Sequence, residues 1–127
     1  MKNFLFKMKI DIESCNLIDS CYRREGYMWS ALTLIEATKE LETFDLPLAG
    51  IDLNISPWHG TGTIDGFVYH ANRILKTDLK YPIILDDKGT VCEGWHRIVK
   101  AILMGRKSIK AKRLFKMPTH DSYEKVE

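Results

Sequence analysis

The sequence predicts an α/β domain of the α+β kind, in which a small mixed sheet is flanked by about three helices. Its 127 residues are 45% hydrophobic and 28% charged, as is usual for a globular domain. Short apolar runs with strand character alternate with longer amphipathic segments, which is the pattern of a mixed fold. No repeat or interdomain linker is visible, so we expect residues 1–127 to form one domain whose core needs neither disulfide nor metal.

Residues 1–43 are interpreted as an extension that consists of a strand and a helix. The strand is predicted from apolar side chains that alternate with mostly polar ones, at Phe4, Phe6, Met8, Ile10 and Ile12. After a polar stretch, Ser30 is expected to cap a helix that ends near Glu42. The side chains expected to face the core from this helix are Leu32, Ile35 and Leu41.

Residues 44–116 are interpreted as the core of the domain, and residues 117–127 as a flexible polar tail. The apolar run at 82–85 is typical of a strand that is covered on both faces. The elements expected in order are a strand at 48–53, a loop at 56–62, a helix from Thr63 or Asp65 to about Thr77, the strand at 82–85, a tight turn at 86–89, a strand at 90–92, a helix between Gly94 and Gly105, and a strand at 109–113.

The turn before the third helix carries the residues with the clearest chemical meaning. Gly94 lets the backbone bend sharply and approach a ligand. The helix that begins after it offers free N–H groups to an anion. His96 and Arg97 add donors at the same end, and a guanidinium can hold a phosphate with two parallel hydrogen bonds. Lys100, one turn further, is expected to reach the same area.

Two carboxylates are the candidate catalytic groups. Glu93 precedes the anion site and would repel phosphate unless it binds magnesium or accepts a proton; the alternative is a salt bridge to Arg97. Asp52 lies with Trp58 and His59 at the end of the first core strand, where ligands usually bind in α/β domains. Trp58 is a candidate for stacking on a base, and the alternative is that it covers the edge of the core.

A resemblance to the ParB/sulfiredoxin superfamily covers roughly residues 44–114. It is carried by Leu46-Pro47-Leu48 with Ile51, by the run Pro-Ile-Ile-Leu-Asp-Asp-Lys-Gly-Thr-Val-Cys-Glu-Gly-Trp-His-Arg at 82–97, and by Lys100, Ala101, Gly105 and Ile109 after it. Members have a Pro-Ile strand, a hairpin, an acidic-Gly-x-His-Arg or related turn, and a helix that ends near a glycine. The resemblance implies this fold and a nucleotide (ATP, ADP or CTP), with Mg²⁺ as a possible companion. Its phosphates would lie at Gly94, Trp95, His96 and Arg97.

The known members use this turn for different chemistry. They include partition proteins that hydrolyse CTP, ATP-dependent reductases of sulfinic acids, and an ADP-dependent kinase of free serine. The Asp-Gly-His-His-Arg turn of the kinase is the most similar to residues 93–97. Trp95 occupies the position of the catalytic cysteine of the reductases. Cys92 lies three residues earlier, and its strand position predicts burial and a raised thiol pKa rather than catalysis.

The resulting functional expectation is a nucleotide-binding domain that acts as a nucleotide-dependent phosphotransferase or nucleotide hydrolase. Two alternatives remain open. One is a DNA-binding or nuclease-like module that uses the basic run at 106–116, above all Lys110 and Lys112; that run is otherwise a solvated strand face. The other is a protein-binding adaptor that keeps the fold without catalysis. Nothing in the pattern indicates a resident metal site.

Cysteine usage and hydropathy give the expected compartment. The three cysteines are Cys15, Cys21 and Cys92, without a C-x-x-C pair, so neither a disulfide framework nor a zinc knuckle is predicted. Free thiols are usual in the reducing cytoplasm. No apolar stretch approaches the ~20 residues of a membrane span, and the first residues lack the apolar run of a signal peptide.

Overall fold

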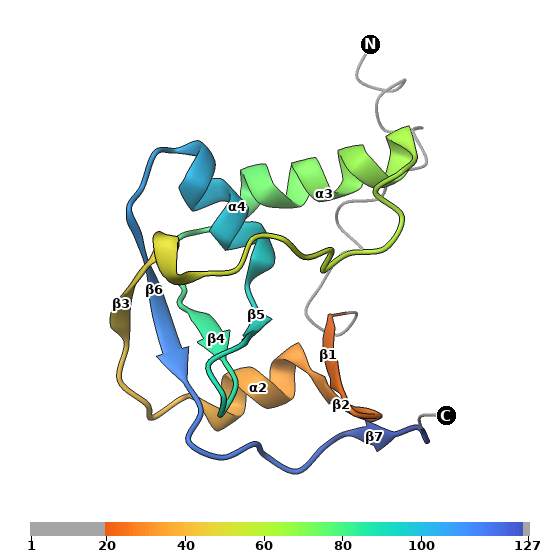
Figure 1. The fold of residues 1–127 in the computed structure, drawn as a ribbon, viewed down its shortest axis with the longest axis vertical. Helices are drawn as coiled ribbons and strands as arrows, with labels where there is room; N and C mark the ends of the chain where they lie inside the picture. Colours follow the sequence, from red (N-terminus) through yellow and green to blue (C-terminus); the bar gives the residue numbers. More distant parts are fainter. Residues whose placement is uncertain (1–19, 126–127) are drawn as a thin grey trace.

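The computed structural model describes residues 20–125 (Figure 1). The strand expected between Phe4 and Ile12 lies outside the described residues, as does Cys15. Within 20–125 the chain forms a mixed α+β fold with three α-helices, so the predicted fold class is confirmed. No helix in this part of the chain is long and apolar enough to cross a membrane.

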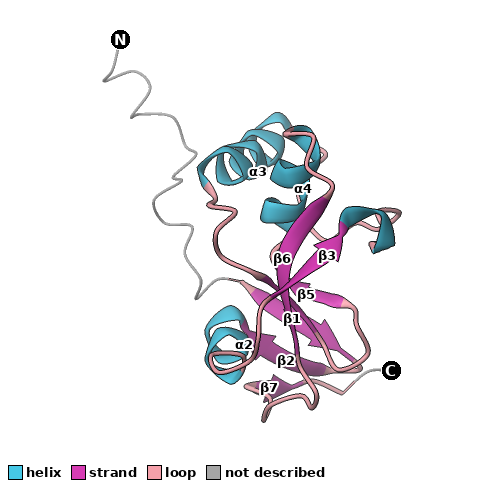
Figure 2. Ribbon diagram, turned by 90° about the vertical axis from the view of Figure 1, so that its left-hand side faces the viewer, coloured by secondary structure: helices cyan, strands magenta, loops and turns pink. Residues whose placement is uncertain are grey.

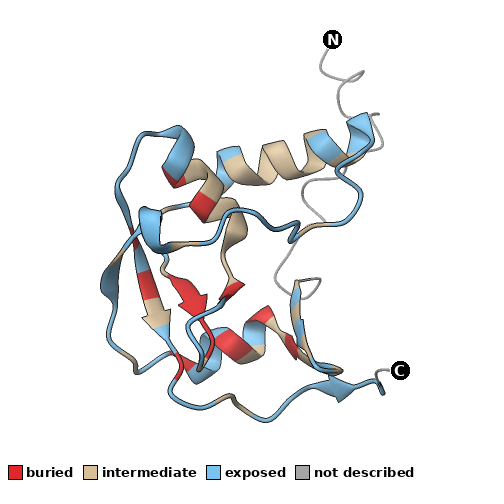
Figure 3. Ribbon diagram, viewed as in Figure 1, coloured by how far each residue is buried: buried red, intermediate tan, exposed pale blue. Residues whose placement is uncertain are grey.

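A four-stranded mixed sheet forms the centre of the fold, in the order β3-β6-β4-β5. Its strands are β3 (Phe44–Pro47), β4 (Ile83–Leu85), β5 (Val91–Glu93) and β6 (Ser108–Arg113). The central strands β4 and β6 are parallel, and Ile83 lies opposite Ala111, whereas the two outer pairings are antiparallel. All three residues of β4 are buried, as its apolar run predicts (Figure 3).

Two helices pack together at one end of this sheet (Figure 2). Helix α3 (Ile64–Lys76) begins where the Thr63 side chain accepts a hydrogen bond from the Gly66 N–H at 3.1 Å, as predicted. Helix α4 (Trp95–Leu103) begins after Gly94 and buries Ile98 and Ala101. No residue of α3 is buried, so one face of this helix has no cover in the described part of the chain.

A second sheet, which the sequence pattern did not indicate, forms at the other end (Figure 2). It has the order β1-β2-β7 and consists of β1 (Cys21–Arg24), β2 (Tyr27–Ser30) and β7 (Ser122–Tyr123). The predicted flexible tail is therefore packed in its described part, because β7 pairs with β2 and the Trp29 indole donates to the Pro118 carbonyl at 2.8 Å. Hydrogen bonds to distant residues hold this stretch despite its polar composition.

Helix α2 (Ala31–Ala37) and the strand after it differ from the expectation. Ser30 caps α2 as predicted, but the helix ends five residues before Glu42 and buries Ala31 and Leu34 instead of Leu32 and Ile35. The strand expected at 48–53 lies earlier, at β3, because those residues pair with β6. Its successor is a short 3₁₀ turn, η2 (Leu48–Gly50). Pro47, which has no N–H to donate, ends the strand.

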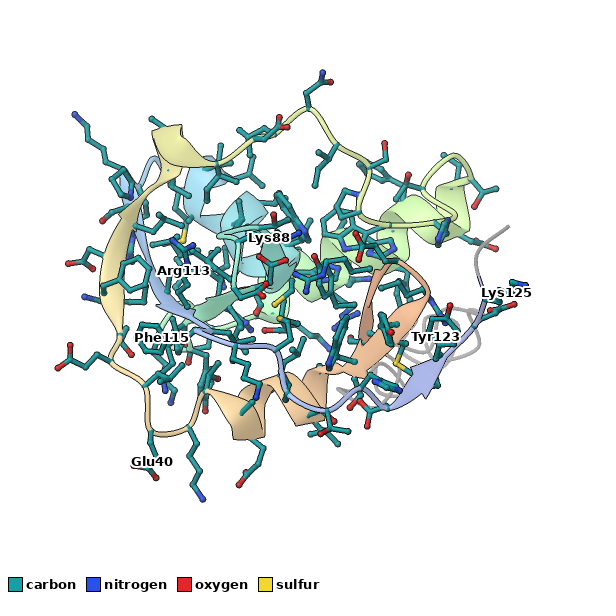
Figure 4. The ribbon with its side chains drawn as sticks, turned by 60° about the horizontal axis from the view of Figure 1, so that its bottom comes forward. Glu40, Lys88, Arg113, Phe115, Tyr123 and Lys125 are labelled. Carbon is teal, nitrogen blue, oxygen red and sulfur yellow. The ribbon has the colours of Figure 1, made fainter. Side chains whose placement is uncertain are left out.

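Asp86 links the two sheets through the predicted turn at 86–89. Its carboxylate accepts from the Tyr22 hydroxyl at 2.9 Å and from Arg24 at 3.0 Å, as well as from two N–H groups of the turn. Burial alone would raise the pKa of Asp86, but these hydrogen bonds outweigh it and hold the pKa below its ordinary value. Arg113, labelled in Figure 4, completes the turn by donating to the Asp87 carbonyl at 3.0 Å.

Candidate functional site

A cavity of about 300 Å³ lies at the N-terminus of α4. Most of the candidate site residues of the turn and the preceding loop line it. These are Glu93, Gly94, Trp95, His96, Trp58 and His59. Helix α3 adds His70 and Arg73 to the wall, and the first described residues, Ser20 and Cys21, stand at its side. The structure therefore brings together residues from four separate parts of the chain.

Three aromatic rings form the centre of this wall. His70 Nδ1 lies 2.9 Å from His96 Nε2, and the two imidazoles are nearly parallel, with an angle of 11° between them. The Trp58 indole stacks on both imidazoles, with ring centroids 4.6 Å from His70 and 4.4 Å from His96. His70 is thus a partly buried, hydrogen-bonded histidine. The stack fixes the loop that carries Trp58 against α3 and α4.

The two imidazoles are neutral at physiological pH. Burial above all, and then electrostatic repulsion from Arg73, His70 and Arg97, together lower the pKa of His96 to about 3. Burial and then Arg73 also lower the pKa of His70, against a hydrogen bond with the His59 backbone. Arg73 therefore lies close enough to both rings to act on them. It forms no ion pair with a carboxylate of residues 20–125.

The histidine pair makes stability depend on pH. The pKa of His96 is about 3 when folded against an ordinary value of 6.5, so between these values the unfolded chain binds a proton that the folded chain does not. The contribution of His96 to the free energy of unfolding should be complete above pH 6.5. It should fall on acidification by at most ~1.4 kcal/mol per pH unit, and by less because His96 is partly exposed. Urea unfolding at pH 7.5 and 5.0 should show a smaller pH effect in His96→Gln; equal effects in both proteins would contradict this.

Arg97 points away from this cavity. Its Nη2 forms an ion pair with Glu93 Oε2 and donates to the Pro82 carbonyl at 3.3 Å. Both side chains are only 13% exposed. Arg97 lines a separate, larger cavity of about 670 Å³ between α2, β4 and the end of α3. Arg97 thus forms the salt bridge to Glu93 that was the alternative to a phosphate contact. Glu93 lines both cavities and lies between them.

Lys100 and Asp52 are not on the wall of the α4 cavity either. The Lys100 ammonium donates to the carbonyls of Leu75 and Thr77, at 3.0 and 2.6 Å, and so binds the C-terminal end of α3. Asp52 is exposed and its carboxylate accepts from the Asn54 N–H at 2.9 Å. Both side chains therefore form hydrogen bonds within the fold, outside the α4 cavity.

The two lysines considered for nucleic acid also have partners within the fold. Lys110 forms an ion pair with Asp45 at 2.7 Å on the exposed face of the sheet. Lys112 donates to the Thr38 carbonyl at 2.9 Å, at the end of α2. Both ammonium groups therefore have partners within the domain. No observation on the described residues favours a DNA interface on this strand.

Cys92 has the surroundings predicted for a structural thiol. It is 8% exposed and its sulfur donates to the Ile84 carbonyl at 3.3 Å. Burial raises the pKa of this thiol far above its ordinary value, and the nearby carboxylates Asp86 and Glu93 raise it further. Residues 20–125 contain no group of three or more side chains with metal-ligating atoms placed to hold an ion.

Arg73 and the pairing of His70 with His96 are the features that the sequence analysis missed. Arg73 follows His70 by three residues, so both lie on one face of α3. That spacing was visible in the sequence. The packing of α3 against α4, which brings this face to the glycine turn, depends on tertiary structure and was not.

No model of a known protein family, no curated protein and no solved structure matches this chain.

Proposed function

We propose that this chain is a nucleotide-binding domain of the ParB/sulfiredoxin type, whose ligand places its phosphates in the cavity at the N-terminus of α4. The observation that carries the proposal is the meeting of Arg73 with the first turn of α4 in one cavity. The N–H groups of Trp95 and His96 belong to that first turn and have no acceptor within the helix. A helix start and a guanidinium are both well suited to phosphate.

The ion pair of Glu93 with Arg97 removes the main objection to an anion at this position. An unpaired carboxylate beside the helix start would repel phosphate. Arg97 neutralises it from the far side of the turn. In this proposal Arg97 supports the site by holding Glu93, and Arg73 is the cation that faces the ligand. In this proposal Arg73 of α3 therefore binds the phosphate, which is the role that the sequence predicted for Arg97.

The neutral histidine pair suits the same ligand. A neutral imidazole can donate its N–H to a phosphate oxygen without the cost of burying a further charge. The two neutral imidazoles also leave the cavity with one net positive group, Arg73, beside the dipole of α4. Transfer or hydrolysis of the phosphoryl group would need Mg²⁺ as well as this positioning. Glu93 lines the cavity, and its carboxylate would supply an oxygen ligand to Mg²⁺.

Loss of Arg73 should weaken nucleotide binding strongly. A hydrogen bond to a charged group contributes ~1.5–3 kcal/mol, so Arg73→Gln should lower affinity for ADP, ATP or CTP by about 10- to 150-fold. Arg73→Lys should recover part of this because an ammonium lacks the planar fork. Calorimetric titration with and without Mg²⁺ is the measurement. Arg106→Gln, an exposed arginine away from the cavity, is the control. Equal affinities in wild type, Arg73→Gln and the control would place any phosphate site elsewhere.

A further inference from the structure

The larger cavity, of about 670 Å³, takes no part in the proposed function. It lies between α2, β4 and the end of α3, and Glu93 separates it from the α4 cavity. Its volume lies within the range of pockets that bind small molecules. One part of its wall is apolar and another part is cationic, so the cavity suits a ligand that combines an apolar body with a negative charge.

The apolar part of the wall comes from α2, from β4 and from the residues just before β4. Ile84 of β4 is buried, and Pro82 lies just before that strand. Ile35 of α2 and Tyr81 also line the cavity, and they are 39% and 57% exposed although both are large side chains. A ligand with an apolar body would remove part of this surface from water, which favours binding.

Lys112 and Arg97 supply donors on the cationic part of the wall. The half-buried Lys112 ammonium donates to the carbonyls of Thr38 and Lys39, at 2.9 and 3.4 Å, so its partners are neutral oxygens and a third N–H remains. The contacts of the Arg97 guanidinium described above all use Nη2, and its buried Nε–H has no acceptor in residues 20–125. Both side chains therefore retain N–H donors for an acidic ligand.

The carboxylates on the wall favour a ligand with a single negative charge. The ion pair described above neutralises Glu93, and Asp78 pairs with Lys80 at 3.8 Å. Glu36 is exposed, so solvent and salt screen its charge. A monoanion would compensate the Lys112 ammonium, whereas a phosphate dianion would place a second negative charge near Glu93 and Glu36.

We propose that the larger cavity binds a small carboxylic acid with an apolar body. The carboxylate accepts hydrogen bonds from Lys112 and Arg97, and the body packs on Ile35 and Tyr81. Two carboxylate oxygens match donors from two side chains. The site is separate from the proposed phosphate site, although Glu93 lines both cavities, and it does not rest on the proposed function.

The test titrates the ¹⁵N-labelled full chain with 3-phenylpropionate and follows its amide signals. We expect shifts at Tyr81, Arg97 and Lys112 and a dissociation constant of about 1 mM or lower. 3-Phenylpropionamide has the same shape without the charge, and acetate has the charge without the ring. Each should bind at least about tenfold more weakly, because the charge-assisted hydrogen bonds and the buried ring both contribute to affinity.

Two variants test the two parts of the wall. Lys112→Met keeps an apolar stem and removes the charge, so it should weaken binding of 3-phenylpropionate about tenfold. Tyr81→Ala removes a mostly exposed side chain and should weaken binding about threefold or more. Lys110→Met is the matched control, because Lys110 lies on the same strand outside the cavity. It should keep the wild-type affinity, and all three variants should keep the wild-type affinity for ADP.

Four results would overturn the proposal. The absence of amide shifts with 3-phenylpropionate would exclude the site. Equal affinities for the acid and its amide would show that the cavity does not recognise a carboxylate. Tighter binding of the tripeptide Gly-Gly-Phe, with a free C-terminus, would make the occupant the end of a protein chain. Displacement of 3-phenylpropionate by ADP at Lys112 would make the cavity a phosphate site, whereas ADP shifts at Trp95 and His96 alone would leave both proposals standing.

Discussion

Replacement of Arg97 by alanine should destabilise the folded chain by about 3 kcal/mol, because loss of one partner of a buried ion pair leaves the other charge unpaired. Glu93 is 13% exposed, and Arg97 also bonds to the Pro82 carbonyl. The variant loses the contacts with Glu93 and with the Pro82 carbonyl, and it leaves the Glu93 carboxylate unpaired beside β4. Urea unfolding at pH 7.5 measures the effect. Arg106→Ala, on an exposed arginine, should change the free energy of unfolding by no more than ~0.5 kcal/mol.

A double substitution separates the two roles considered for Arg97. In Glu93→Gln/Arg97→Met both charges are absent, so most of the lost stability should return. Affinity for a nucleotide should change little in this double variant if Arg73 is the phosphate ligand. A folded Glu93→Gln/Arg97→Met protein that has lost more than tenfold in nucleotide affinity without Mg²⁺ would instead place the phosphate on Arg97, in the larger cavity.

Gly94→Ala should destabilise the folded chain by about 3 kcal/mol or more, from backbone strain and overpacking. Gly94 has a φ of +116°, and a Cβ there would lie 2.5 Å from the Cγ2 atom of Ile83. Ile83 is fully buried and has little room to move. The start of α4 would have to shift, and with it the N–H groups at the proposed phosphate site.

Two other glycines separate the causes of this effect. Gly60 has a φ of +76° in open space, so Gly60→Ala should show the backbone strain alone, about 1 kcal/mol. Gly50 has open space and no positive φ, so Gly50→Ala should be close to neutral. Thermal unfolding of the three variants under one condition should rank them Gly94, Gly60, Gly50. A Gly94→Ala protein as stable as Gly50→Ala would contradict the close packing of β4 against the turn.

The local part of this fold was predictable from the sequence. The apolar run of β4, the Asp-Asp-Lys-Gly turn and the glycine before α4 each follow from the preferences of a few adjacent residues, and the structure places them as expected. The hairpin of β1 and β2 was not predicted because β1 lies in a polar stretch and each strand is only four residues long. Tyr22 and Trp29 are held by residues more than sixty positions away, Asp86 and Pro118.

The site was predictable in its turn and not in its partners. Trp58, His59 and the residues from Glu93 to His96 were named from the sequence and line one cavity. The direction of Arg97 was not decidable, because a salt bridge to the residue four positions earlier and a phosphate contact need the same side chain at the same place. Arg73 reaches the cavity only through the packing of α3 on α4, which no local pattern specifies.

The most direct measurement for the central claim is a titration of ¹⁵N-labelled wild-type protein with ADP, followed by amide and arginine Nε chemical shifts. Binding in the α4 cavity predicts that the Trp95 and His96 amides and the Arg73 Nε signal shift together and give one dissociation constant. The same titration of Arg73→Gln should need about 10- to 150-fold more ADP. Shifts confined to Arg97 and Lys112, which line the larger cavity, with Trp95 and His96 unmoved, would contradict the account.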